Sequence, residues 1–133
     1  MSFQFSETLR NLWLDDIETI GGVSPLLYIR TGSPPTNCAA VDTGTLLCTI
    51  TLPSDWMSAA ASGAKSKLGT WQATTAVTGT PGHFRFKTSG GTCFWQGTAT
   101  VDTLSGDMEI DIVPIQSGRL FTVSVCTVTS PGA

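Results

Sequence analysis

The sequence predicts an all-β domain, a β-sandwich or jelly roll of about seven strands, with one N-terminal amphipathic helix. Several stretches after residue 68 alternate apolar and polar side chains with a period of two, which is typical of half-buried strands. Turns rich in Gly and Pro separate these stretches. Before residue 22, by contrast, the apolar residues recur at helical spacing.

The helix is predicted from about Glu7 to Ile20. Ser6 can cap its first turn, because a hydroxyl accepts a hydrogen bond from an unpaired backbone N–H. Gly21 and Gly22 are expected to end it, since glycine accepts the left-handed conformation that follows a helix. The helix is either a lid over an open end of the β structure or an arm that docks on a partner. Its apolar residues on one side are Leu9, Leu12, Trp13, Ile17 and Ile20.

The remainder is predicted to be strands and turns within one domain. A chain of 133 residues without a repeat or linker favours a single unit, with residues 1–22 as helix or docking arm and residues 23–133 as β core. The clearest hairpin joins residues 83–88 to residues 92–101 through Ser89-Gly90-Gly91. Residues 54–66, rich in Ala and Ser, are expected to form a surface loop or short helical turn. Strands are expected at residues 26–30, 46–52, 68–73, 83–88, 92–101, 108–113 and 120–129.

Composition limits the classes of partner. Charged residues make up 13% of the chain, about half the usual level, which suits a protein packed against neighbours. The net charge of −3 and the scattered basic residues argue against nucleic acid or an anionic membrane. The start of the chain has no signal-peptide pattern, so we expect synthesis in a cytoplasm.

The chemistry-bearing residues predict no catalytic or metal site. His83 is the only histidine, follows a Pro-Gly turn and is expected at the surface or in that turn. We therefore expect no enzyme and no cofactor; a hydrolase with His83 as base is the one enzymatic alternative. The cysteines lack Cys-x-x-Cys spacing, and reduced, buried thiols are favoured over a Cys38–Cys48 bridge. The cysteines are Cys38, Cys48, Cys93 and Cys126.

An acidic trio and one tryptophan are further candidates for binding sites. Asp107, Glu109 and Asp111 share one face of an expected strand but spread over about 13 Å, too far to chelate one cation. A solvated sheet face or a protected sheet edge is the preferred interpretation. Trp56, in its polar loop, is the tryptophan expected to be exposed and available for stacking on a sugar.

Three stretches of the chain together resemble a known family. They are residues 9–22, residues 27–40 with 43–47, and residues 82–86 with 96–98. Their order resembles that of small proteins encoded among the virion structural genes of tailed bacteriophages and prophages. The resemblance covers residues 9–129 and brings no active-site residues with it. Phe86-Lys87-Thr88 departs from the more polar strand end expected there.

The resemblance implies a non-enzymatic virion structural protein made in the bacterial host cytoplasm. A capsid decoration or cement protein that bridges and stabilises capsid subunits is the first expectation. The expected partner is the major capsid protein or another virion protein, with self-association as a trimer or dimer. The alternatives are a tail-tip, fibre or head–tail connector component and, from another class, a host-glycan-binding module. The candidate partner-binding residues are Leu12, Trp13, Ile17, Pro34, Pro35, Trp56 and Met57.

Overall fold

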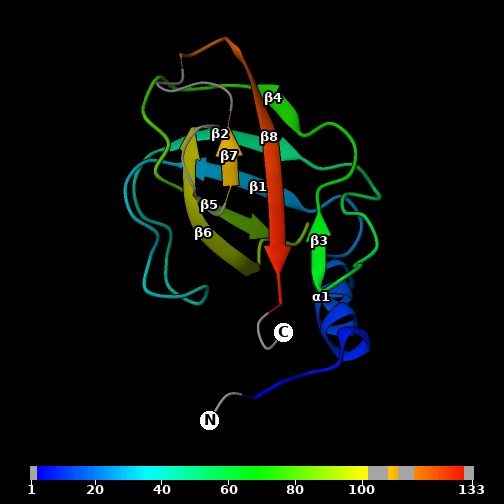
Figure 1. The fold of residues 1–133 in the computed structure, drawn as a ribbon. Coiled ribbons are helices and arrows are strands. Elements are labelled where there is room, and N and C mark those ends of the chain that lie inside the picture. Colours follow the sequence, from blue (N-terminus) through cyan, green and yellow to red (C-terminus); the bar gives the residue numbers. More distant parts are fainter. Residues whose placement is uncertain (1–2, 102–107, 111–115, 131–133) are drawn as a thin grey trace.

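The computed structural model describes residues 3–101, 108–110 and 116–130 of the chain. It confirms a mostly β protein with one N-terminal helix (Figure 1). The helix precedes all of the described strands. The elements are α1 (Glu7–Gly21), β1 (Leu26–Arg30), β2 (Leu46–Thr51), β3 (Ala64–Ser66), β4 (Gln72–Thr74), β5 (His83–Lys87), β6 (Cys93–Val101), β7 (Met108–Ile110) and β8 (Leu120–Thr129).

The described strands form one hydrogen-bonded path in the order β2-β1-β5-β6-β7-β8-β3, and β4 also pairs with β8. Neighbours are antiparallel except for β6 and β7, which run parallel. The first half of β8 pairs with β4 and its second half with β3. The sheet also curls back on itself, because Ala76 N donates to Leu47 O at 3.0 Å just beyond β4. The edges formed by β2 and β4 therefore meet over a shared interior.

The core lies between β8 and the strands that it crosses, β1 and β5 (Figure 1). Phe121 and Val123 of β8 belong to the same buried cluster as Leu27 and Ile29 of β1. Aromatic rings fill much of the remaining interior, and the largest of these buried rings belong to Trp56, Trp71, Phe84 and Phe86.

The predicted hairpin of β5 and β6 is confirmed, with a bulge near its turn. Phe86 pairs with Trp95, but Lys87 pairs with Cys93, so Phe94 is an extra residue on β6. A bulge of this kind bends its strand and redirects side chains. Here the ring of Trp95 stacks on Phe86 at 4.5 Å, while Cys93 takes the position opposite Lys87.

The other strand predictions hold with shifted bounds. The strand expected at residues 68–73 is instead β4, at residues 72–74. Of residues 108–113, the last three lie outside the described residues, and β7 pairs with β8 as expected. Residues 54–66 are not only a loop or helical turn, because they end in β3. Ser62 and Gly63 take positive φ angles of 53° and 73°, and this turn leads directly into β3.

The helix prediction is confirmed at both ends. Ser6 Oγ accepts a hydrogen bond from Leu9 N at 3.2 Å, as an N-cap should. Gly22 has a φ angle of 74° and its N–H donates to Glu18 O at 2.9 Å, which closes the last turn. The helix lies at one end of the β structure, beside β3 (Figure 1).

Candidate partner-binding surface

The face of α1 that touches the rest of the protein carries few large apolar groups. Leu14 and Gly21 are buried and Ile17 is half-buried against the core. A Cβ at Gly21 would lie 2.7 Å from the ring of Phe94 and 2.8 Å from that of Trp56. Glycine at this position therefore allows the end of the helix to lie directly on the aromatic core.

A buried lysine supplies the strongest polar attachment of the helix. Lys65 on β3 is 1% exposed, and its Nζ lies 2.7 Å from Asp15 Oδ1 and 2.6 Å from Glu18 Oε1. It also donates to Ser58 O at 2.8 Å. Burial lowers the pKa of Lys65, but its hydrogen bonds to the two carboxylates outweigh burial and leave this pKa raised. The bond to Lys65 in turn lowers the pKa of Asp15.

The loop before β3 adds hydrogen bonds from its backbone. Gly63 N donates to Asn11 Oδ1 at 2.9 Å, and Ala60 N donates to Asp15 Oδ1 at 3.0 Å. A Cβ at Gly63 would meet the Arg10 guanidinium at 2.2 Å, so this loop approaches the helix very closely. Polar contacts therefore hold much of α1 on the β structure.

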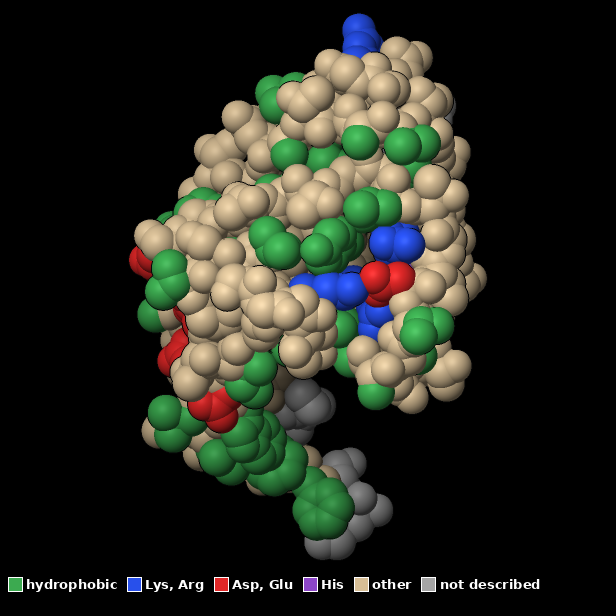
Figure 2. Space-filling view, turned by 180° about the vertical axis from the view of Figure 1, so that it is seen from behind, with side chains coloured by type: hydrophobic (Ala, Val, Ile, Leu, Met, Phe, Trp, Pro, Cys, Tyr) green, Lys and Arg blue, Asp and Glu red, His purple; other side chains and the backbone are tan. Residues whose placement is uncertain are grey.

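The large apolar side chains of α1 point away from the protein. Leu12, Trp13 and Ile20 are 59%, 43% and 62% exposed, and Leu9 lies on the same side of the helix. Phe5, just before the helix, packs edge-on against Trp13 with ring centroids 4.9 Å apart. Figure 2 shows hydrophobic side chains gathered at this end of the molecule. We call Phe5, Leu9, Leu12, Trp13 and Ile20 the helix apolar face.

The candidate partner-binding residues on the helix differ in their exposure. Leu12 and Trp13 are exposed, as a partner contact requires. Ile17 lies four residues after Trp13 and about 40° from it around the helix, but it is half-buried and packs against the core. Of these three candidate residues, Leu12 and Trp13 are therefore uncovered, whereas the protein's own core partly covers Ile17.

The predicted exposure of Trp56 and Met57 is also wrong. They are 0% and 1% exposed. The Trp56 indole donates from Nε1 to Gly22 O at 3.1 Å, and its ring packs 5.7 Å from the ring of Phe86. The end of the helix thus supplies the acceptor that lets this side chain be buried. Neither residue is available to a partner, and Trp56 offers no platform for a sugar.

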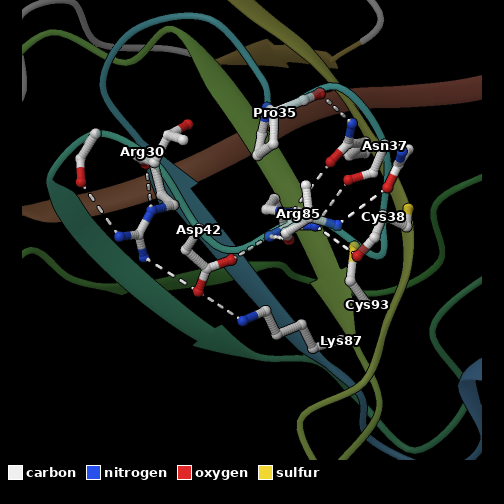
Figure 3. Close-up of polar contacts among 12 residues, drawn as sticks. Arg30, Pro35, Asn37, Cys38, Asp42, Arg85, Lys87 and Cys93 are labelled. Atoms are coloured by element: carbon white, nitrogen blue, oxygen red, sulfur yellow. Dashed lines mark hydrogen bonds and ion pairs between the residues drawn. The ribbon is translucent and has the colours of Figure 1, made fainter.

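The loop between β1 and β2 contains Pro34 and Pro35, both half-buried. It folds over one face of β5, where Arg85 is buried with its guanidinium pointing at loop carbonyls (Figure 3). Gln96 fixes the same loop by donating from Nε2 to Pro35 O at 2.8 Å. The loop is therefore held by its backbone. The acceptors for Arg85 are Gln96 Oε1, Asn37 O, Cys38 O, Ala40 O and Asp42 Oδ1.

Asp42 is the acidic partner of three basic side chains. Lys87 Nζ donates to its Oδ2 at 2.6 Å, Arg85 bonds its Oδ1, and Arg30 lies 3.8 Å away. Burial raises the pKa of Asp42, but the bonds from Lys87 and Arg85 outweigh burial and leave this pKa lowered. Three cations around one carboxylate leave a local excess of positive charge.

A cavity of about 730 Å³ opens beside this cluster. Figure 2 shows it as a hollow in which basic and acidic side chains meet. Its lining is mixed in polarity, and the basic groups there are already engaged by Asp42 and by loop carbonyls. The lining residues include Cys38, Asp42, Arg85, Lys87 and Cys93.

The expectation of a surface or turn histidine is wrong for His83. Its side chain is 0% exposed, with Nδ1 2.9 Å from Gly32 O. The same loop that covers Arg85 covers this end of β5, so both faces of the strand are buried. Nε2 is buried as well, and no group in the described part of the chain is a hydrogen-bond partner for it.

Comparisons with family models, with curated proteins and with solved structures find no significant match to this chain. Within residues 3–101, 108–110 and 116–130, no three His, Cys, Asp or Glu side chains are grouped to hold a metal ion. No helix in the described part of the chain has the length and apolar content needed to cross a membrane. The acidic trio considered above includes Asp107 and Asp111, which lie outside the described residues.

Proposed function

We propose that this chain is a non-enzymatic virion structural protein of a tailed bacteriophage, a capsid decoration protein that bridges neighbouring capsid subunits. The helix apolar face is the observation that carries this proposal. Several large apolar side chains lie together on the outer side of α1, and hydration of such a patch is unfavourable. A helix needed only as a lid would be expected to turn these side chains inward.

The attachment of α1 supports the same conclusion. The helix is bound to β3 and its preceding loop by hydrogen bonds and ion pairs. These contacts keep the helix apolar face in a fixed position without covering it. A surface ordered in advance loses little conformational entropy when it docks.

The β structure serves in this proposal as a rigid support, and we place it in the β-sandwich class. Protein that binds only the assembled shell stabilises the shell by mass action, as any state-selective ligand does. A second copy of the chain can occupy part of the helix apolar face, giving a dimer or trimer on the shell. The burial of Trp56 leaves the glycan-binding alternative without its candidate residue.

Cryo-electron microscopy of particles that contain this chain tests the proposal. Density that repeats over the icosahedral shell, with α1 against capsid subunits, is the expected result. Density confined to one vertex or to the tail would replace the capsid role with a tail or connector role. Absence of the chain from purified particles would overturn a virion role altogether.

A further inference from the structure

Two cysteines that are far apart in the sequence lie side by side in the cavity described above. Cys38 is in the loop between β1 and β2, and Cys93 begins β6. Both line the cavity and both are half-buried (Figure 3). By contrast, Cys48 is buried, with its Sγ 3.9 Å from Ala73 O on another side of the protein core.

Two structural features bring this pair together. Arg85 donates to the carbonyl of Cys38 at 2.8 Å and so fixes the loop at that residue. The bulge at Phe94 places Cys93 opposite Lys87, whose side chain lines the same cavity. Both cysteines are therefore held beside the cavity by ordered backbone.

We propose that Cys38 and Cys93 are a modification site that closes to a disulfide bond when the protein meets a small-molecule disulfide oxidant. One thiolate attacks a sulfur of the oxidant, forms a mixed disulfide and expels one small thiolate. The second protein thiolate attacks the protein sulfur of that mixed disulfide and expels the other small thiolate. The protein loses two protons and two electrons, which the two released thiols carry.

The surroundings of the pair determine how fast it closes. Burial, and then the hydrogen bond and charge of the Cys93 thiol, raise the pKa of Cys38 to about 11. The thiolate is the attacking species, so attack by Cys38 is slow at neutral pH and accelerates as the pH rises. Once formed, the bond joins the loop between β1 and β2 to β6 and restricts the unfolded chain between the two residues. This inference does not depend on the proposed function.

The test uses the full chain, purified in reductant and then incubated with oxidised glutathione at pH 7 and pH 9. The expected product is two hydrogens lighter, carries no glutathione and forms faster at pH 9. Fragmentation of the non-reduced tryptic digest should join Cys38, and not Cys48, to Cys93. The closed protein should unfold at a higher temperature than the reduced protein.

Matched variants separate this pair from the other thiols. Cys48→Ala should still close, whereas Cys93→Ser and, independently, Cys38→Ser should stop at a stable glutathione adduct or remain unmodified. Glutathione adducts that persist on the wild-type chain, or a bridge to Cys48 or Cys126, would overturn the proposal. The peptide mapping is made on wild-type protein, so it remains decisive if a variant folds poorly.

Discussion

Replacing Lys65 with Met removes the cation that joins α1 to β3 while nearly preserving the length of the side chain. The Lys65 ammonium makes close contacts to Asp15, Glu18 and Ser58 O, at 2.6–2.8 Å. Lys65→Met leaves the apolar core unchanged, so its effect reports on the polar attachment of the helix.

The expected loss of stability is moderate. Hydrogen bonds to charged groups contribute about 1.5–3 kcal/mol each, but burying the ammonium offsets part of that gain. The carboxylates regain hydration in the variant, since Asp15 is 47% and Glu18 26% exposed. We therefore expect a net loss of about 2 kcal/mol. With an unfolding entropy of about 2.1 cal/mol/K per residue over 133 residues, this lowers Tm by roughly 7 °C.

Thermal unfolding followed by circular dichroism measures this loss, with Lys67→Met as the control. Lys67 Nζ donates to the neutral Gly69 O at 2.9 Å and lies 5.9 Å from the centre of the Trp71 ring, so we expect Lys67→Met to lower the free energy of unfolding by about 0.5 kcal/mol. An unchanged or higher Tm for Lys65→Met would refute the conclusion that ion pairs hold the helix in place.

The stability of the wild type and of Lys65→Met should depend on pH in a defined direction. The pKa of Asp15 is lowered from 3.8, so its contribution is present above pH 3.8 and is lost as the pH falls through the lower folded value. The pKa of Lys65 is raised from 10.5, so its contribution is present below pH 10.5 and is lost as the pH rises through the higher folded value. Lys65→Met should therefore lose less stability than the wild type at both acid and alkaline pH. Plots of unfolding free energy against pH that run parallel for the two proteins would contradict the coupling between Lys65 and Asp15.

Two further predictions concern the loop between β1 and β2. Gly82→Ala should destabilise the protein by about 3 kcal/mol, because its Cβ would lie 2.2 Å from Gly32 O. Gly90→Ala should unfold at nearly the wild-type denaturant midpoint, because its Cβ would make an ordinary van der Waals contact, 3.7 Å from Thr88 Oγ1. Asp42→Asn should lower the free energy of unfolding by about 2–3 kcal/mol, because it leaves the buried Arg85 cation without its carboxylate. In an acid titration, this variant should lose less stability below pH 3.8 than the wild type does. Equal denaturant midpoints for the two Ala variants would contradict the first prediction. Acid unfolding of Asp42→Asn at the same pH as the wild type would contradict the second.

Features set by neighbouring residues could be predicted from the sequence. Ser6 and Gly22 act on backbone groups within a few residues, so both ends of α1 were predictable. The β5–β6 hairpin follows from local alternation and its glycine turn. Helical spacing places Leu12 and Trp13 on one side of the helix, but it leaves open whether that side is covered by the β structure or exposed.

Features set by distant residues could not be predicted in the same way. The burial of Trp56 depends on a carbonyl 34 positions away in the sequence, at Gly22. Arg85 alternates with Phe84 and Phe86, which predicts a solvent-facing side chain until a loop covers that face of the strand. An arginine between two phenylalanines in a chain with few charges was nevertheless a usable indication of a structural ion pair.

The binding role of the helix apolar face is tested most directly by co-sedimentation with phage particles assembled without this chain. Leu12→Ser combined with Trp13→Ser removes the centre of that face, and Val41→Ser, at a position 83% exposed, is the control. All three proteins should share the same Tm within about 2 °C, since these side chains lie outside the core. We predict that the wild type and Val41→Ser bind the particles and that the double variant binds at least tenfold more weakly, about 1.4 kcal/mol. Wild-type affinity in the double variant would contradict the account.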